Sequence, residues 1–406
     1  MRSSGALART AVERAPERSR PDAAPLHKGT GANELRGEIL ERDALLGIEP
    51  AWLDLCDRCA EDNVYYSPGY AKALLQSVER NTDVRFAVVW NEAQLVGFLP
   101  FTRSKITIPL LQAARKAWRS QYTFSCTPVL DRHQKLEAAN ALIDVLAAES
   151  AGEWILPTVN IRGEACQVFV LALENRQAPW AISNLFERAV LDVGSTYDEH
   201  MKRHVSTSRR KGLNRNRRRL EELGSVEHRS YTSGNGLDAA VSAFLKIEAS
   251  GWKGKRGTAL ACDEWTRKFA VSAFGGTEGQ PICRADLLVL NGEPIAVSLI
   301  VSAGTTGFAV KCAYDEAYRT YSPGLVLELE VIRSFLSEGW ARRLDGATAG
   351  AHAIDELWSG RVDVADLTFS LARSNSKFRL SALSRADHYK QAARSTAKRL
   401  LGLVRS

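Results

Sequence analysis

The sequence has no long hydrophobic run, which excludes a first class of proteins. No stretch of about 18 consecutive apolar residues occurs among the 406 residues, and a membrane-spanning helix needs at least that length. Residues 1–35 contain several arginines but no apolar core of signal-peptide length. We therefore expect a cytoplasmic protein with a disordered tail over 1–35. A mitochondrial presequence is the alternative for this segment, although Glu13, Glu17 and Asp22 interrupt it.

Cysteines are few and do not form a metal-binding pattern. There are seven, and the Cys56–Cys59 C-x-x-C pair has no second pair to complete a zinc site. The surrounding letters AWLDLCDRCAED predict a helix, so we interpret both as buried thiols in a reducing compartment. His200 and His204 stand four residues apart, a spacing that can hold a metal on a helix. Because cations surround them, we expect no metal cofactor.

Nucleotide and metalloprotease motifs are also missing. The chain has no glycine-rich loop ending in G-K-S/T and no H-E-x-x-H. What it has is an ordinary globular composition, with 45% hydrophobic and 25% charged residues. Its length predicts two domains, and its net charge of +7 suggests anionic partners.

The first half of the chain predicts one α/β unit over 36–190. Apolar spacing of about 3.6 residues indicates helices, and short β-branched or aromatic runs between turn residues indicate strands. On these criteria we expect helices over 36–60, 68–79 and 136–149, and strands over 85–90, 95–103 and ILPTVNI.

The second half predicts another unit over 191–375, followed by a basic tail over 376–406. Its hairpin LVLNGEPIAVSLIV has the same shape as VVWNEAQLVGFLPF in the first half, which suggests a duplicated unit. Here we expect helices over 196–223, from Leu237, over 263–274 and from Leu325, strands over 284–290, 294–302 and 308–314, and a short strand in ARRLDGA.

Three features of the second half can carry chemistry. Arg319 to Gly324 precede a helix, and a helix N-terminus binds phosphate through unpaired N–H groups, although Pro323 supplies none. Residues 201–220 hold nine Lys or Arg and no acid. Such a density favours binding of coenzyme phosphates, a polyanionic substrate or tRNA over a merely solvated face. The loop 250–258 can close over an anionic or sugar-like ligand, or it can be a surface loop that Trp252 anchors to the core.

These features occur in an order that resembles a known family. The order is a basic helix ending in glycine, then W-K-G, a hairpin with P-I-A, K-x-A-Y-D-E-x-Y, and S-P-G before a helix. It resembles the large GCN5-related N-acetyltransferase (GNAT) family that includes cellulose-biosynthesis-type acyltransferases. In layout it is similar to the Fem-type peptidoglycan aminoacyl transferases, which have paired GNAT-like halves. The matching residues include Arg209, Arg210, Arg215, Trp252, Lys253, Lys311, Ala313, Tyr314, Asp315, Ser322 and Gly324.

The resemblance implies a fold, a reaction and a set of sites. The fold would be α/β (α+β), with two tandem GNAT-like domains, each a mixed, mostly antiparallel sheet flanked by helices. An acyl group, most simply acetyl, would pass directly from acyl-CoA to an amine. The pyrophosphate would lie at Arg319, Ser322 and Gly324, and backbone N–H groups near Lys311, Cys312 and Ala313 would meet the oxyanion. The acceptor, an amine that can be anionic, would contact Arg209, Arg210, Arg215, Trp252, Lys253 and Tyr314.

A base must remove a proton from the amine before it can attack. Four acids lie near the motifs, and we rank Asp315 and Asp263 above Glu248 and Asp345 because they flank the recognised letters; Asp315 can instead merely cap a turn. Three other functions stay open. One is a Fem-type transferase that uses aminoacyl-tRNA, and another is a non-catalytic nucleic-acid-binding protein. The third is a structural partner in an envelope-polysaccharide assembly whose catalytic residues have decayed.

Overall fold

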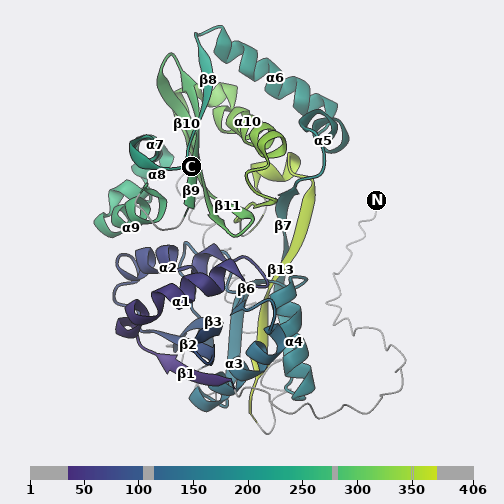
Figure 1. Cartoon of the computed structure of the whole chain (residues 1–406). Coiled ribbons are helices and arrows are strands. Elements are labelled where there is room, and N and C mark those ends of the chain that lie inside the picture. The colour runs from purple at the N-terminus through teal and green to yellow at the C-terminus, as the bar shows by residue number, and fades with distance from the viewer. Residues whose placement is uncertain (1–34, 104–113, 277–281, 349, 351, 373–406) are drawn as a thin grey trace, which may run out of the picture. The chain divides into compact units, whose positions relative to one another are not determined.

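The computed structural model describes residues 35–103, 114–276, 282–348, 350 and 352–372 (Figure 1). The tails expected over 1–35 and 376–406 lie outside these residues, apart from Leu35. The protein is a mixed α/β structure in which helices flank a mixed, mostly antiparallel sheet. This fold class is the predicted one. None of the helices in these ranges combines the length and the apolar character needed to cross a membrane.

The first half has one strand where a helix was expected. Residues 36–40 form β1, which pairs antiparallel with the edge of β2. The helix predicted over 36–60 is therefore wrong for its first residues, and helical structure begins only with the 3-10 turn Arg42–Ala44. Pairing with an open strand edge outweighed local helical spacing there. The elements are β1 (Arg36–Leu40), α1 (Leu45–Asp57), α2 (Pro68–Leu75), β2 (Val84–Asn91), β3 (Gln94–Arg103), β4 (Arg115–Ala117), β5 (Val129–Leu130), α3 (Lys135–Glu149), β6 (Glu153–Asn160), α4 (Glu164–Asn175) and β7 (Trp180–Asp192).

The second half follows the predicted order and adds two strands, β8 and β13, that the sequence did not reveal. The basic region forms two helices, the second of which ends before Gly224. The elements are α5 (Tyr197–His204), α6 (Thr207–Glu221), β8 (Val226–Tyr231), α7 (Gly234–Ser250), α8 (Trp252–Lys255), α9 (Glu264–Phe274), β9 (Ile282–Leu290), β10 (Glu293–Ala303), β11 (Thr306–Tyr314), α10 (Pro323–Glu338), β12 (Arg343–Asp345) and β13 (Gly360–Ser370).

The two halves repeat one topology. In the first, the β2–β3 hairpin leads to β4, and β4 pairs in parallel with β6 after helix α3. In the second, the β9–β10 hairpin leads to β11, and β11 pairs in parallel with β12 after helix α10. The turn of the second hairpin uses Asn291 and Gly292, both with positive φ (51° and 87°), as its sequence predicts.

A strand exchange joins the halves into one sheet. The order is β1-β2-β3-β4-β6-β13-β7-β12-β11-β10-β9-β8. The last strand of the second half, β13, pairs with β6 of the first, while β7 of the first half pairs with β12 of the second. β13 and β7 also pair with each other. A division of the chain at residue 190 stays a prediction.

Helices cover both faces of the second-half sheet. α7, α8 and α9 lie on one side of β9–β11, and α10 with α6 lies on the other (Figure 1). The first layer is packed around Phe244, Phe269 and Leu299, and the second around Leu213, Leu327 and Ile300. The C-x-x-C thiols of the first half are both buried and free, which confirms the structural interpretation of Cys56 and Cys59.

The exchanged strand gives a stability prediction. Asp366 of β13 is buried and accepts hydrogen bonds from Thr158 N of β6 (2.9 Å) and Asn184 Nδ2 of β7 (2.8 Å). Asp366→Ala leaves the buried Thr158 N–H and the half-buried Asn184 amide without this acceptor. It should therefore lower the free energy of unfolding by about 1–3 kcal/mol for the buried donor and by less for Asn184. Asp363→Ala, on the same strand, removes only a surface pair with Arg162 and should cost less than about 1 kcal/mol. Equal losses in urea denaturation would contradict the role of Asp366.

Candidate active site

The strands β11 and β12 lie together for only part of their length. They pair in parallel at Thr306–Phe308 and Arg343–Asp345, where β12 ends. Strand β11 continues to Tyr314, and its later residues have β10 on one side and no strand of the described chain on the other. The second half of β11 therefore presents an open backbone edge.

A β-bulge sets the direction of the side chains on this open part. Ile300 pairs with Ala309 and Leu299 pairs with Lys311, so Val310 is the extra residue. Ala309 packs towards the α10 layer, whereas Ala313 lies in the core on the α7 side. An extra residue shifts the alternation by one, and this turns Lys311 and Ala313 towards α7.

The same geometry fixes the backbone donors. Asp315 N donates to Ile295 O of β10 at 2.8 Å. Because N–H groups alternate sides along a strand, those of Ala313 and Lys311 also point at β10. The N–H groups of Cys312 and Tyr314 then point at the open edge. Of the three residues whose N–H groups were predicted to meet the oxyanion, only Cys312 has its N–H on the open edge; Tyr314 supplies the second edge donor.

A hollow over the end of β11 brings together residues from both motifs. Five predicted site residues line it, and they come from α8 and from the open edge. If the loop 250–258 were only a surface loop, Trp252 would be expected to anchor it to the core. The Trp252 side chain is instead 52% exposed, and its backbone N donates to Glu316 Oε1 (2.7 Å). The lining residues are Ile247, Glu248, Gly251, Trp252, Lys253, Cys312, Ala313, Tyr314 and Glu316.

The N-terminus of α10 lies next to this open edge. Ser322 is the N-cap residue, has a left-handed backbone (φ 51°) and makes no side-chain capping bond. Its carbonyl accepts from Leu325 N and Val326 N, and Pro323 has no N–H, which leaves Gly324 N–H as the unpaired donor of the first turn. A Cβ added at Gly324 would lie 3.5 Å from Tyr314 Cδ1 and 3.6 Å from Cys312 Sγ. Arg319 is exposed in the preceding 3-10 turn.

Both acids ranked first from the sequence are helix caps. Asp315 Oδ1 accepts from Ala317 N at 2.9 Å, at the start of the 3-10 helix Glu316–Tyr321. Asp263 Oδ1 accepts from Trp265 N and Thr266 N, both at 3.0 Å, at the start of α9. Each carboxylate is thus already used by its own backbone, as the capping alternative for Asp315 anticipates. Their service as bases stays a prediction.

Glu248 and Lys253 line the hollow, and Lys311 lies near both of them. Glu248 is buried and accepts from Lys253 Nζ (2.7 Å) and from Leu260 N (2.8 Å). Lys311 Nζ lies 4.9 Å from the centre of the Tyr122 ring. Burial lowers the pKa of Lys311 to about 8; the charge of Lys253 adds to this lowering and that of Glu248 opposes it.

The basic helix α6 packs by a short apolar seam. Leu213 and Leu220 are buried, but Leu223 is 47% exposed because it lies beyond the helix end at Glu221. Some cations have partners: Arg209 pairs with Glu356 (2.9 Å), and Arg210 donates to Thr207 Oγ1 (3.1 Å).

Part of this helix lines a second hollow. It contains Arg209 and Arg215 but not Arg210, so the predicted acceptor residues fall into two groups. One group surrounds β11 and the other lies on α6. This hollow is lined by Ser206, Ser208, Arg209, Gly212, Leu213, Arg215, Asn216 and Glu356.

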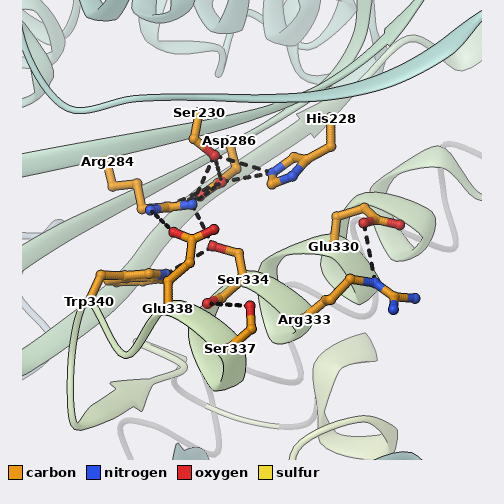
Figure 2. A network of polar contacts seen from close by, with 10 residues as sticks. All are labelled: His228, Ser230, Arg284, Asp286, Glu330, Arg333, Ser334, Ser337, Glu338 and Trp340. Atoms are coloured by element: carbon orange, nitrogen blue, oxygen red, sulfur yellow. Dashed lines mark hydrogen bonds and ion pairs between the residues drawn. The ribbon is translucent and has the colours of Figure 1, made fainter. Parts of the chain in front are cut away.

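A serine, a histidine and an aspartate also meet beneath β8, but not as a nucleophilic triad (Figure 2). His228 Nε2 contacts Asp286 Oδ1 (2.9 Å) and Ser230 Oγ (3.3 Å). A relay requires the serine and the acid on opposite ring nitrogens, and here one nitrogen faces both. Arg284 donates to the same carboxylate and lies 4.6 Å from the Trp340 ring centre. We interpret this cluster as a structural network that holds β8, β9 and α10 together.

Among the described residues, no group of three or more His, Cys, Asp or Glu could hold a metal ion. His200 is buried, and its Nε2 lies 2.8 Å from Leu357 O, so this nitrogen is engaged with the backbone rather than presented to a metal.

The comparisons with known proteins define the class. Residues 207–352 match the acetyltransferase (GNAT) domain family, a segment that contains the bulge, the open edge and the start of α10. This segment, less than half of the chain, is thus similar to a GNAT acetyltransferase domain. No curated protein sequence shows a significant match.

Two solved structures share the fold over most of the chain. One is a conserved protein of unknown function from Bacteroides thetaiotaomicron VPI-5482, with a TM-score of 0.51 and 12% identity, covering 82% of this chain and 100% of that one. The other is FemX, with a TM-score of 0.51 and 11% identity, covering 80% of this chain and 94% of that one. At such identities the likeness concerns the fold alone, and it confirms the resemblance in layout to Fem-type proteins.

Glu328 of α10 gives a pH-dependent prediction. It is buried and accepts from Trp358 Nε1 (2.7 Å), and burial raises its pKa to about 8. A carboxyl with a raised folded-state pKa stabilises the fold below its unfolded pKa of about 4.3 and loses that contribution as the pH rises towards 8. Glu328→Gln cannot titrate. It should therefore be more stable than the wild type at pH 8, by on the order of a few kcal/mol, and similar to it near pH 4.5.

Urea unfolding of both proteins at several pH values measures this difference. Glu338→Gln on the same helix is the control, because Glu338 has an exposed side chain. A stability difference between wild type and Glu328→Gln that does not change with pH would contradict the buried, protonated carboxyl.

Proposed function

We propose that the protein is an N-acyltransferase that moves an acyl group, most simply acetyl, from acyl-CoA to an amine. The observation that carries this proposal is the open edge of β11, where the N–H groups of Cys312 and Tyr314 have no strand partner. An extended thioester arm fits such an edge, because it can accept backbone hydrogen bonds that a strand would otherwise accept. The GNAT domain match covers the same segment.

The phosphates of the donor would lie at the N-terminus of α10. A helix from Pro323 to Glu338 has a positive dipole end, Gly324 offers its N–H, and Arg319 is exposed beside it. The absence of a side-chain cap from Ser322 leaves this end open to a ligand. Gly324 also lets the backbone approach the open edge, because a larger side chain would project into the space beside Tyr314 and Cys312.

The chemistry would be direct transfer. The donor arm and the amine would be held together over the end of β11, and proximity then supplies much of the acceleration. The carbonyl oxygen gains negative charge as the carbon–nitrogen bond forms. The edge N–H groups of Cys312 and Tyr314 are placed to stabilise that charge.

The acceptor would occupy the hollow beside α8. Trp252 and Tyr314 are both large and exposed (52% and 42%), and exposed aromatic faces suit sugar rings or other flat groups. Arg256 lies 5.1 Å from the Trp252 ring centre, and Lys253 lines the same hollow. These features support an amine-bearing, anionic acceptor. An envelope or exopolysaccharide precursor would fit, as the resemblance to cellulose-biosynthesis-type acyltransferases implies.

A second candidate donor is aminoacyl-tRNA. The observation in its favour is α6, where Lys211, Arg215 and Arg218 are exposed and have no ion pair within the described residues. A row of such cations suits a phosphate backbone and would give steeply salt-dependent binding. The open edge of β11 serves either donor, since both present an activated carbonyl.

Isothermal titration distinguishes the donors. The full chain is titrated with acetyl-CoA, longer acyl-CoAs, phosphate-truncated analogues and charged tRNA. Micromolar binding of acyl-CoA that depends on the pyrophosphate is the expected result. Binding of charged tRNA alone would replace the proposed donor, and binding of uncharged nucleic acid alone would favour a non-catalytic role.

Two variants test the phosphate site. Arg319→Ala removes a charge-assisted hydrogen bond, worth about 1.5–3 kcal/mol, so the Kd of acetyl-CoA should rise about tenfold or more. Gly324→Leu should weaken binding at least as much by filling the site. Gly324→Ala is the matched control, because its Cβ meets only ordinary contacts at 3.5 and 3.6 Å. Unchanged affinity in both Arg319→Ala and Gly324→Leu would reject this placement.

A further inference from the structure

The reaction needs a base, and the carboxylates around the hollow are already engaged. Both oxygens of Glu248 accept hydrogen bonds, from Lys253 and from Leu260 N. Glu316 accepts from Trp252 N and pairs with Lys255 (3.6 Å). Asp315 and Asp263 cap their own helices. Each of these carboxylates is therefore oriented towards a protein donor rather than towards an incoming amine.

Lys311 differs from all of these groups. Within the described residues, its Nζ makes no hydrogen bond and no ion pair, and the Tyr122 ring lies 4.9 Å away. The bulge at Val310 turns it to the α7 side of the sheet, directly next in sequence to two residues that line the hollow. Lys311 is half-buried, and an ammonium that is partly withdrawn from water without a direct counter-ion is disfavoured relative to the neutral amine.

We propose that Lys311 Nζ is the base that takes the proton from the incoming amine. This inference rests on the proposed function. Neutral Lys311 accepts one proton from the acceptor ammonium, and the resulting amine attacks the thioester carbonyl carbon. The new carbon–nitrogen bond forms, the carbon–sulfur bond breaks, and the departing thiolate takes the second proton from the attacking nitrogen. Lys311 then releases its proton to water.

The groups around Lys311 support this role. Three elements face it: Glu248 comes from α7, Lys253 from α8, and Tyr122 from the segment before β5. Tyr122 stacks on Phe269 of α9 at 4.7 Å, and its pKa, which burial raises to about 12, also responds to Glu248 and Asp263. Near neutral pH, Lys253 is therefore paired and Tyr122 is protonated. Lys311, with a pKa lowered to about 8, is the group suited to exchange a proton there.

Two substitutions of Lys311 distinguish a role as a base from a role as a positive charge. Arginine keeps the charge but cannot be deprotonated in proteins, and methionine removes both. Lys311→Arg and Lys311→Met should each lower the kcat for release of the coenzyme A thiol by about 100-fold or more. The KM for acetyl-CoA should stay within about twofold, since the base is not part of the phosphate site. Lys246→Met is the matched control, because Lys246 is exposed on α7 away from the hollow.

The choice of acceptor gives a readout that a structural defect would not move. Hydroxylamine is already neutral at the assay pH, so it does not need a base to become nucleophilic. With hydroxylamine, the loss in both variants should shrink to a few-fold. Full activity of Lys311→Arg, or an equal loss with hydroxylamine and with alkylamines, would overturn the proposal.

A titration of Lys311 tests the proposal without any acceptor. The lysines of the full chain are ¹³C-methylated, and the resonance missing from Lys311→Arg is followed with pH by NMR. We expect an apparent pKa near 8; an ordinary value near about 10.4 would overturn the proposal. Failure of the wild type to bind acetyl-CoA would reject the proposed donor, whereas the titration would still report on Lys311 itself.

Discussion

The pairing of β7 with β13 is the constraint on which the open edge depends. β12 is only three residues long, and it is held between β11 on one side and β7 on the other. β7 is in turn fixed by its long ladder with β13. Because β12 stops opposite Phe308, the point at which β11 loses its partner is set by strands that lie outside the matched GNAT segment. The three residues of β12 thus determine where the open edge of β11 begins, because β7 and β13 hold β12 in place.

The electrostatics of the hollow follow from how its carboxylates are used. Glu248 and Glu316 fix backbone groups and lysines on α8, so they shape the hollow rather than react in it. Asp315 and Asp263 start helices. Lys311 faces the Tyr122 ring. The charged groups near it are Lys253 and Glu248, which form an ion pair with each other. On the other face of the sheet, the cations of α6 are carried by a seam of only two buried leucines, which keeps their side chains at the surface.

Much of this architecture is predictable from sequence, and the exceptions have physical reasons. The α10 helix and the β9–β10 hairpin are encoded locally, by apolar spacing and by Asn291–Gly292. Strands β1 and β13 are not, because each forms only against a distant edge. The bulge at Val310 also leaves no local mark, since it depends on the register with β10. For that reason the sequence predicts the Lys311 backbone near the reacting group. It does not predict the direction of the Lys311 side chain or its lack of a hydrogen-bond partner among the described residues.

The strand exchange also has a consequence for biosynthesis. β6 ends at Asn160, whereas its partner β13 begins only at Gly360, so β6 is synthesised well before the strand that pairs with it. The first half therefore has an exposed sheet edge until β13 has been synthesised, and the long-range pairing that closes this edge is intrinsically slow. Nascent chains with such edges invite association with one another. The single continuous sheet thus depends on synthesis of the chain as far as Ser370.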